Sequence, residues 1–218
     1  MSDAASLNIG RDFFRRDPVT CAQELIGCEL YWNQCRGIIV ETEAYTATND
    51  EAAHTFFRPS ARAFVSNHEA GAAYVYMNYG MYWLLNVLIK GGTEDGFVLI
   101  RALEPIQGIP LMQRRRFGPK AKIRPLTALC SGPGKLSIAM KIDGRDHGRD
   151  LCDQREVGFR HSDRTPRVNW VSDIRVGITR AVHLPWRFLA DGSPFVSVKT
   201  VKIKSATAAS AATSAKNS

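Results

Sequence analysis

The stretch YVYMNYGMYW, residues 74–83, decides how the middle of this chain folds. Residues 72–77 and 81–89 are rich in side chains that favour strands, and the triplet Asn-Tyr-Gly at 78–80 between them favours a tight turn. The stretch therefore predicts a β-hairpin. It also gathers four tyrosines and a tryptophan with no charged residue among them.

The tyrosines of this hairpin could serve either a core or a ligand. Side chains alternate across a strand, so Tyr74 and Tyr76 should share one face. Aromatic residues often simply cover a half-buried sheet, and that explanation is open for Tyr74 and Tyr82. Tyr79 lies in the turn itself, where a ring buries little of its surface. A protruding side chain of this kind is how some proteins enter a nucleic-acid stack.

Outward from the hairpin, runs of β-branched, aromatic and other apolar residues predict further strands. These are expected at residues 28–32 and 36–45, joined at Asn33-Gln34, and at 96–103, 155–160, 174–180 and 195–203, with a turn at Asp191-Gly192. Helices are expected at 18–27, 104–116 and 130–144, the second kinked or shortened by Pro110, with a helical turn at most at 49–54.

The order of these elements indicates the fold class. Strands come in hairpins, and helices lie between them without a regular β-α-β rhythm, which indicates an α+β fold. We expect a single domain, residues 1–204, built on a curved, mostly antiparallel β-sheet with surrounding helices. Residues 205–218, SATAASAATSAKNS, are a low-complexity segment and are expected to be a disordered tail.

Composition is that of a globular protein expected to act inside the cell. Of 218 residues, 44% are hydrophobic and 23% charged. No apolar run is long enough to predict a transmembrane helix, and no secretory signal is expected at the N-terminus. Five cysteines without a C-x-x-C pair favour buried, reduced thiols over a metal site. The net charge of +8 favours a polyanionic partner, although the basic stretches 114–124 and 198–204 could equally be solvated surface.

A second motif, IVETEAY at residues 39–45, places two acids on an otherwise apolar strand. Alternation puts Glu41, Glu43 and Tyr45 on one face. Burying two carboxylates is costly, so either they reach water at a strand end or one of them has a chemical role. Arg101 ends another apolar strand and is the obvious charge partner. A carboxylate held by an arginine stays ionised at neutral pH and can take a proton from water.

Seven short motifs, in this order, resemble the alkyladenine (3-methyladenine) DNA glycosylase family, of the monofunctional type represented by the human enzyme. They are ETEAY (41–45), NDEAAH (49–54), YVYMNYGMYWLLN (74–86), VLIRALEP (98–105), LCSGPGKL (129–136), RVGI (175–178) and DGSPFVSV (191–198). Each motif is weak alone, but the ordered set is specific, and the resemblance covers roughly residues 10–201.

The resemblance implies a base-excision repair enzyme. Such an enzyme flips an alkylated or deaminated purine out of double-stranded DNA and hydrolyses its N-glycosidic bond, which leaves an abasic site. It implies a monomer that uses no cofactor and no metal. Three catalytic residues are implied: Glu43 deprotonates the attacking water, Arg101 holds this water and the acid, and the backbone carbonyl of Val176 faces the water. The anionic acid would also stabilise an oxocarbenium-like sugar.

The resemblance also implies residues that hold the DNA. Tyr45, His54 and Tyr76 would sandwich the flipped base, and Asn86 would line its pocket and discriminate against the exocyclic amine of guanine. Tyr79 would fill the gap left in the duplex. The residues implied at the DNA backbone are Lys135, Met81 and Tyr82. From the residues alone, His54 could be an ordinary surface histidine, and SGPGKL around Lys135 could be a simple helix start.

One segment departs from the family pattern. Residues 60–71 keep only Arg62 and Gly71 of the family stretch T-x-R-N-x-x-M-F-x-x-P-G, so the outer wall of the pocket should differ.

A non-catalytic nucleic-acid binder is the alternative, because it could use the same charge and rings without Glu43 and Arg101. A zinc deaminase would show H-x-E and P-C-x-x-C, and the sequence has neither. The paired helices of a helix-hairpin-helix glycosylase are also missing.

Overall fold

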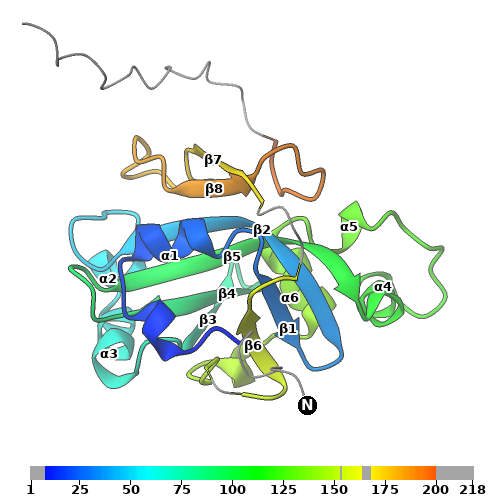
Figure 1. Cartoon of the computed structure of the whole chain (residues 1–218), viewed down its shortest axis with the longest axis horizontal. Helices are drawn as coiled ribbons and strands as arrows, with labels where there is room; N and C mark the ends of the chain where they lie inside the picture. The colour runs from blue at the N-terminus through cyan, green and yellow to red at the C-terminus, as the bar shows by residue number, and fades with distance from the viewer. Residues whose placement is uncertain (1–7, 153, 164–167, 200–218) are drawn as a thin grey trace, which may run out of the picture.

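An antiparallel sheet of eight strands organises the chain in the computed structural model, which describes residues 8–152, 154–163 and 168–199 (Figure 1). The strands are β1 (Glu29–Trp32), β2 (Cys35–Thr46), β3 (Ala73–Asn78), β4 (Tyr82–Ile89), β5 (Gly96–Gln107), β6 (Val157–Arg160), β7 (Trp170–Asp173) and β8 (Arg187–Ala190). Their order is β3-β4-β5-β2-β1-β6, and β8 pairs with both β2 and β7. The expected α+β class and the antiparallel, curled sheet are confirmed.

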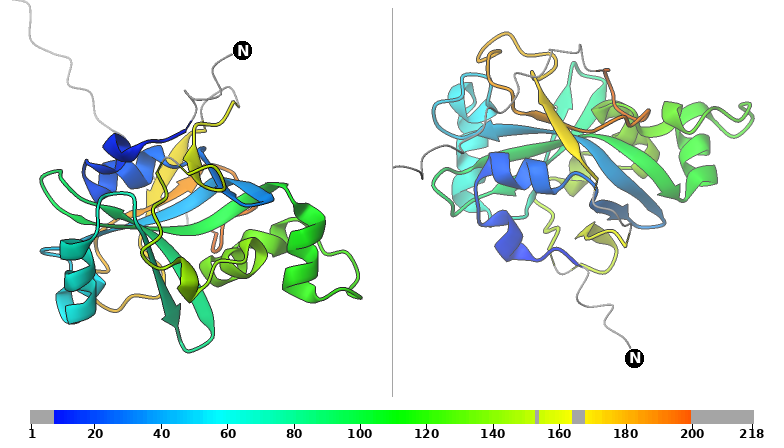
Figure 2. Two further views of the ribbon diagram at one scale, coloured as in Figure 1. Left: turned by 90° about the horizontal axis from the view of Figure 1, so that it is seen from below. Right: turned by 45° about the horizontal axis from the view of Figure 1, so that its top comes forward.

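Helices surround this sheet. They are α1 (Pro18–Glu24), α2 (His54–Phe57), α3 (Pro59–Asn67), α4 (Ile109–Phe117), α5 (Thr127–Cys130) and α6 (Pro133–Met140), with 3-10 turns η1 (Arg11–Phe14) and η2 (Gly144–Asp146). Figure 1 shows α2 and α3 at one end of the long strands β2 and β5, and α4 and α5 at the other. Viewed from below, α1 lies on one face of the sheet, and α6 lies on the other (Figure 2, left).

Strand β2 is the centre of the sheet and carries the two acids. It pairs with β5 along one edge, and with β1 and then β8 along the other. The hydroxyl of Thr42 donates to the carbonyl of Ala22 in α1 at 2.8 Å, so Glu41 and Glu43 point to the opposite face. On β5, Ile100 pairs with Thr42 and Ala102 with Glu41, which leaves Arg101 in a register irregularity between them. Such a bulge re-aims a side chain, here toward the two acids.

The β3–β4 hairpin forms as predicted, and its turn has a defined geometry. Tyr79 and Gly80 both have positive φ, 51° and 66°, and the Met81 N–H donates to the Asn78 carbonyl at 3.1 Å. Two successive left-handed residues reverse the chain within the loop between Asn78 and Tyr82, the last pair of the hairpin. Glycine adopts this conformation freely, but a tyrosine there is strained by about 1–3 kcal/mol. The hairpin tip projects from the sheet (Figure 2, left).

Other predicted elements are confirmed with shifted ends. The hairpin across Asn33-Gln34, the strands within 96–103 and 155–160, and helix α1 are present. The helix expected at 104–116 begins only at Ile109, because Glu104 and Pro105 continue β5 by pairing with β2. Pro110 lies in the first turn of α4, where its missing N–H costs nothing, so it does not kink the helix. Helix α6 ends at Met140, before Gly144.

Two predicted strands are wrong. Residues 174–180 and 195–199 form no strand, while β7, β8 and helix α3 were not expected. The reason lies in the backbone donors: the N–H of Val176 donates to Glu43, and that of Ser197 donates to Glu41. These buried carboxylates take donors that a strand ladder would use. Residues 200–203 and the expected tail at 205–218 lie outside the described residues.

A continuous apolar core lies between the sheet and helices α1, α4, α5 and α6. All five cysteines are buried and lie outside any disulfide, as expected. Within the described ranges, no helix is long and apolar enough to cross a membrane.

Candidate functional site

A cavity of about 600 Å³ lies between the strands that carry the recognised motifs and the loop after β7. Seven aromatic side chains line it: Tyr45, His54, Phe57, Tyr74, Tyr76, Tyr79 and Phe97. Arg101, Asn86 and the backbone segment 176–180 complete much of the remaining wall. The volume is within the usual range for small-molecule pockets, and flat rings in the wall suit a flat heterocycle.

The ring cluster on the β3 side of the cavity is held by local contacts. The His54 and Tyr76 rings are 4.3 Å apart between centroids, and His54 Nδ1 is 3.1 Å from the hydroxyl of Tyr74. Burial, together with the nearby charge of Arg58, lowers the pKa of His54 to about 4. The imidazole is therefore neutral at physiological pH and presents an uncharged ring to the cavity. The side chain is built into the wall, which excludes the plain surface histidine.

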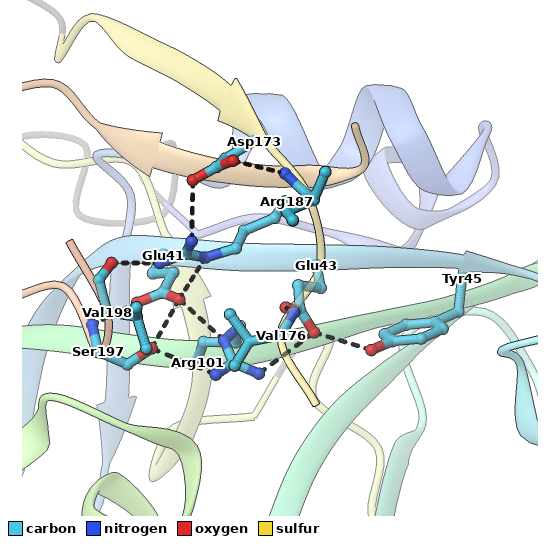
Figure 3. Close-up of polar contacts among 10 residues, drawn as sticks. Glu41, Glu43, Tyr45, Arg101, Asp173, Val176, Arg187, Ser197 and Val198 are labelled. Carbon is cyan, nitrogen blue, oxygen red and sulfur yellow. Dashed lines mark hydrogen bonds and ion pairs between the residues drawn. The ribbon is translucent and has the colours of Figure 1, made fainter. Parts of the chain in front are cut away.

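Glu43 lies directly behind this wall and is fully buried. Its carboxylate accepts three hydrogen bonds: from the Tyr45 hydroxyl at 2.8 Å, from Arg101 Nη1 at 3.2 Å and from the Val176 N–H at 2.7 Å (Figure 3). All three donor residues line the cavity, whereas Glu43 itself does not. The predicted group of Glu43, Arg101 and Val176 is thus brought together, although the contact seen from Val176 is its N–H.

The pKa of Glu43 differs from the expectation for an arginine-held acid. Burial raises this pKa above its ordinary value, and the opposing effects of Arg101, the Val176 N–H and the Tyr45 hydroxyl do not cancel the rise. A carboxylate with a raised pKa is a stronger proton acceptor when it is ionised. The arrangement therefore holds a carboxylate in a nearly dry place directly beside the cavity.

Glu41, two residues before Glu43, has a different set of partners. It is fully buried and bound by Arg101 Nε at 2.8 Å, by Arg187 Nε at 2.8 Å and by the Ser197 hydroxyl at 2.7 Å (Figure 3). Arg187 also pairs with Asp173 on β7 at 3.1 Å. The two acids therefore do not reach water at a strand end. They share Arg101, which each contacts through a different guanidinium nitrogen.

A further ion pair behind Tyr45 was not predicted. Arg175 and Asp50 are both fully buried and form a two-pronged pair at 2.6 and 2.9 Å. The guanidinium of Arg175 lies 4.6 Å from the centroid of the Tyr45 ring and 5.3 Å from that of Trp186. It therefore backs the ring that donates to Glu43. Both residues lie within quoted motifs, NDEAAH and RVGI, but nothing in one sequence indicates that these motifs meet.

The hairpin tip lies at the edge of the cavity. Tyr79 is 79% exposed and still lines the cavity, and Met81 and Tyr82 are exposed beside it. Gly134 in α6 approaches Tyr82 so closely that a Cβ there would lie 2.8 Å from the tyrosine side chain. The first turn of α6, with exposed Lys135, is therefore packed against the hairpin. The predicted wedge and backbone residues thus lie on one surface, at the edge of the cavity.

Asn86 forms part of the cavity floor, where its amide is oriented by a hydrogen bond of 3.2 Å to the Tyr74 carbonyl. Sequence reasoning missed Phe57, Glu51 and Arg180, which also line the cavity. In the part of the chain that the structure describes, no three His, Cys, Asp or Glu side chains gather as metal ligands would. The chemistry of this site is that of rings, arginines and one enclosed acid.

Comparison with known proteins identifies the class: the chain is a DNA glycosylase, a hydrolase of N-glycosyl bonds that acts in DNA repair. It belongs to the methylpurine-DNA glycosylase family, whose sequence profile matches residues 12–194.

Two relatives illustrate the likeness, and both carry the name "Putative 3-methyladenine DNA glycosylase". A protein of Rhizobium johnstonii is 42% identical over 187 residues, which are 86% of this chain and 88% of that protein. A protein of Agrobacterium fabrum is 40% identical over 199 residues, 91% of this chain and 97% of that one. The resemblance inferred from the seven motifs is thus confirmed.

Proposed function

We propose that this protein excises N-alkylated purines such as 3-methyladenine from double-stranded DNA by flipping the base and attacking its N-glycosidic bond with an activated water. The observation that carries the proposal is an enclosed acid, Glu43, bonded to three residues of an aromatic-walled cavity. A base stacked inside a duplex is out of reach of such an acid, so it must be rotated out, at a cost of a few kcal/mol.

The cavity walls suit an alkylated purine. Tyr45 would cover one face of the base, and the His54 and Tyr76 rings, which contact each other, would cover the other. An N-alkylated purine is cationic, and an aromatic face attracts a desolvated cation by up to about 2 kcal/mol. A neutral His54 adds no charge that would repel it. The amide of Asn86, at the floor, would contact the purine edge and disfavour guanine.

The chemical step would be carried by Glu43 and its partners. A cationic purine is a good leaving group, so its departure needs no strong acid, which a neutral His54 could not supply. The sugar would pass through an oxocarbenium-like state, which ionised Glu43 stabilises while it takes the proton of the attacking water. Arg101 and Val176, which contact the acid and line the cavity, would hold that water. One C–N bond breaks, one C–O bond forms, and an abasic site remains.

The exposed hairpin tip would replace the extruded base. Tyr79 is exposed and held in a strained left-handed conformation at the cavity edge, so its ring is presented away from the protein. Insertion into the stack would offset part of the cost of flipping. Met81, Tyr82 and Lys135 would then contact the backbone of the same DNA segment.

The direct test uses duplex oligonucleotides that carry 3-methyladenine, hypoxanthine or ethenoadenine, followed by alkaline cleavage of abasic sites. Strand breaks at the lesion, and none in undamaged duplex, are expected. A Glu43→Gln variant should bind lesion DNA as tightly as the wild type without excising the base, whereas a non-catalytic binder would give no breaks with either protein. The absence of breaks with every lesion would refute the proposed function.

A further inference from the structure

Two arginines at the cavity mouth have no role in the chemistry described above. Arg58, between α2 and α3, is exposed and lies over two rings of the cavity wall, 5.6 Å from the centroid of Phe57 and 5.9 Å from that of Tyr76. Arg180, in the loop between β7 and β8, is exposed and lines the cavity directly. The two residues reach the mouth from separate segments of the chain.

Neither guanidinium is paired with an acid of the described residues. Across residues 8–152, 154–163 and 168–199, no carboxylate forms an ion pair with Arg58 or Arg180, whereas Arg101, Arg175 and Arg187 are all paired with acids. The planar group of Arg58 lies over these aromatic rings, and its guanidinium donates no hydrogen bond to another residue that the structure describes. The one acid that lines the cavity mouth among the described residues, Glu51, is itself exposed.

The charge of Arg58 acts on the cavity interior. Together with burial it lowers the pKa of His54, and it opposes the rise that burial causes in the pKa of Tyr76. A cation in this place gains nothing from a cationic base, because like charges repel. An anion that comes to the mouth of the cavity would be attracted to this charge.

An extruded nucleotide brings such anions, because a phosphate flanks it on each side. Guanidinium groups bind phosphate oxygens through two parallel N–H bonds, and the rigid fork of arginine suits this geometry. We propose that Arg58 and Arg180 each hold one of the two phosphates that flank the flipped nucleotide, and so favour the flipped over the stacked state. This inference rests on the proposed function, because it requires base flipping into this cavity.

The proposal differs from general backbone binding in one measurable respect. A phosphate reaches the cavity mouth only when its nucleotide is extruded, so the two contacts should appear with lesion DNA and not with undamaged duplex. Each phosphate contact changes the slope of log K against log salt by about 0.9 for duplex DNA. The magnitude of this slope for lesion DNA should therefore fall by about 0.9 in Arg58→Ala or Arg180→Ala. The slope for undamaged DNA should not change.

Binding is best measured in full-length protein that also carries Glu43→Gln, so that the lesion is not consumed. Loss of one charge-assisted contact should weaken lesion binding about fivefold to tenfold. Arg58→Lys should keep part of the affinity, because it keeps the charge and loses the fork. Arg15→Ala is the matched control: this exposed arginine pairs with Asp12 in η1, away from the residues that line the cavity, and its loss should change neither slope.

A chemical change in the DNA assigns each arginine to its phosphate. Replacing the phosphate on the 5′ or the 3′ side of the lesion by a neutral methylphosphonate removes the anion without changing the protein. A double-mutant cycle compares the effect of each arginine substitution on DNA with and without the methylphosphonate. If the arginine holds the replaced phosphate, its substitution weakens binding to the normal lesion DNA but hardly weakens binding to the methylphosphonate DNA. The expected result is coupling of Arg58 to one phosphate and of Arg180 to the other.

Each outcome decides the proposal. Lesion-selective loss with coupling to a single phosphate supports it. Equal loss on lesion and undamaged DNA would assign these arginines to general backbone contact and overturn it, as would unchanged binding. Failure of the proposed function is seen separately, as the absence of excision and of lesion preference in the protein with intact arginines.

Discussion

Glu41 and Glu43 stand two residues apart on β2, both fully buried, yet their surroundings give them opposite properties. For both, burial favours the neutral form. At Glu41 the charges of Arg101 and Arg187 and the donors of Ser197 outweigh burial, and the pKa is lowered. At Glu43 burial prevails over Arg101, the Val176 N–H and the Tyr45 hydroxyl, and the pKa is raised. The same residue type on one strand face thus has a lowered pKa in one place and a raised pKa in the other.

The two pKa shifts differ because the two acids have different hydrogen-bond and ion-pair partners. The partners of Glu41 come from β5, β8 and the segment at Ser197, so this carboxylate joins three parts of the chain (Figure 3). The partners of Glu43 are residues that line the cavity. Substituting a buried polar residue that holds segments of the fold together should lower the free energy of unfolding. Substituting one that contacts the reacting group should instead lower the rate of excision. Substitutions at the two acids and at their partners test this division.

The largest effect is expected for Glu43→Gln. Loss of a general base lowers the rate of the chemical step by about 10²–10⁴-fold. Because burial already favours the neutral form of this side chain, a neutral isostere should leave the free energy of unfolding nearly unchanged. Single-turnover excision and urea unfolding of the same preparation measure the two quantities. A large loss of stability with a small loss of rate would reverse the roles assigned here.

Glu41→Gln is the matched substitution and should mainly affect stability. The substitution removes the ion pairs of Glu41 with Arg101 and Arg187, and breaking a buried ion pair costs about 3–5 kcal/mol. Arg187 keeps Asp173, and Arg101 keeps Glu43. Urea unfolding should show this loss. Excision per folded molecule should fall far less than in Glu43→Gln, because the cavity lining is preserved. Similar rate losses in both variants would contradict the comparison.

The pH dependence of excision should depend on Glu43. The base must be ionised, and its pKa in the folded protein is raised, so the rate should rise with pH through a value above the ordinary 4.5 of a glutamate. Tyr45→Phe keeps the ring but removes a hydroxyl that lowers this pKa, so the acid limb should move to still higher pH. Single-turnover rates across pH measure the limb, and an unmoved limb would exclude Glu43 as the titrating group.

The smallest effect is expected for Ser197→Ala, which removes a hydroxyl from Glu41. The loss of one buried hydrogen bond should cost about 1 kcal/mol at neutral pH. Because the pKa of Glu41 is lowered by folding, its stabilisation is present above the ordinary value of 4.5 and is lost as the pH falls through the folded value. The difference from the wild type should therefore shrink in acid, as urea unfolding at several pH values would show. The acid limb of excision should not move.

Much of the fold and the site could be predicted from local pattern. The hairpin around Tyr79 follows from strand formers that flank a turn triplet, and the shared face of Glu41 and Glu43 follows from alternation. The strands predicted at 174–180 and 195–199 are wrong. These segments have strand-like sequences, but their backbone N–H groups donate to the side chains of Glu43 and Glu41 on β2. No local pattern records a donor that is used by an acid about 130 residues earlier in the chain.

The sequence by itself determined the family and the antiparallel hairpins, and it singled out Glu43 and the rings as candidates, since these depend on residue type and order. Only the tertiary structure decided which of the two glutamates on one face of β2 has a lowered pKa, that His54 is neutral, and that Arg175 backs the Tyr45 ring. The physical reason is that a pKa depends on burial and on charges within a few ångströms. Those neighbours come from distant segments, and only folding brings them together.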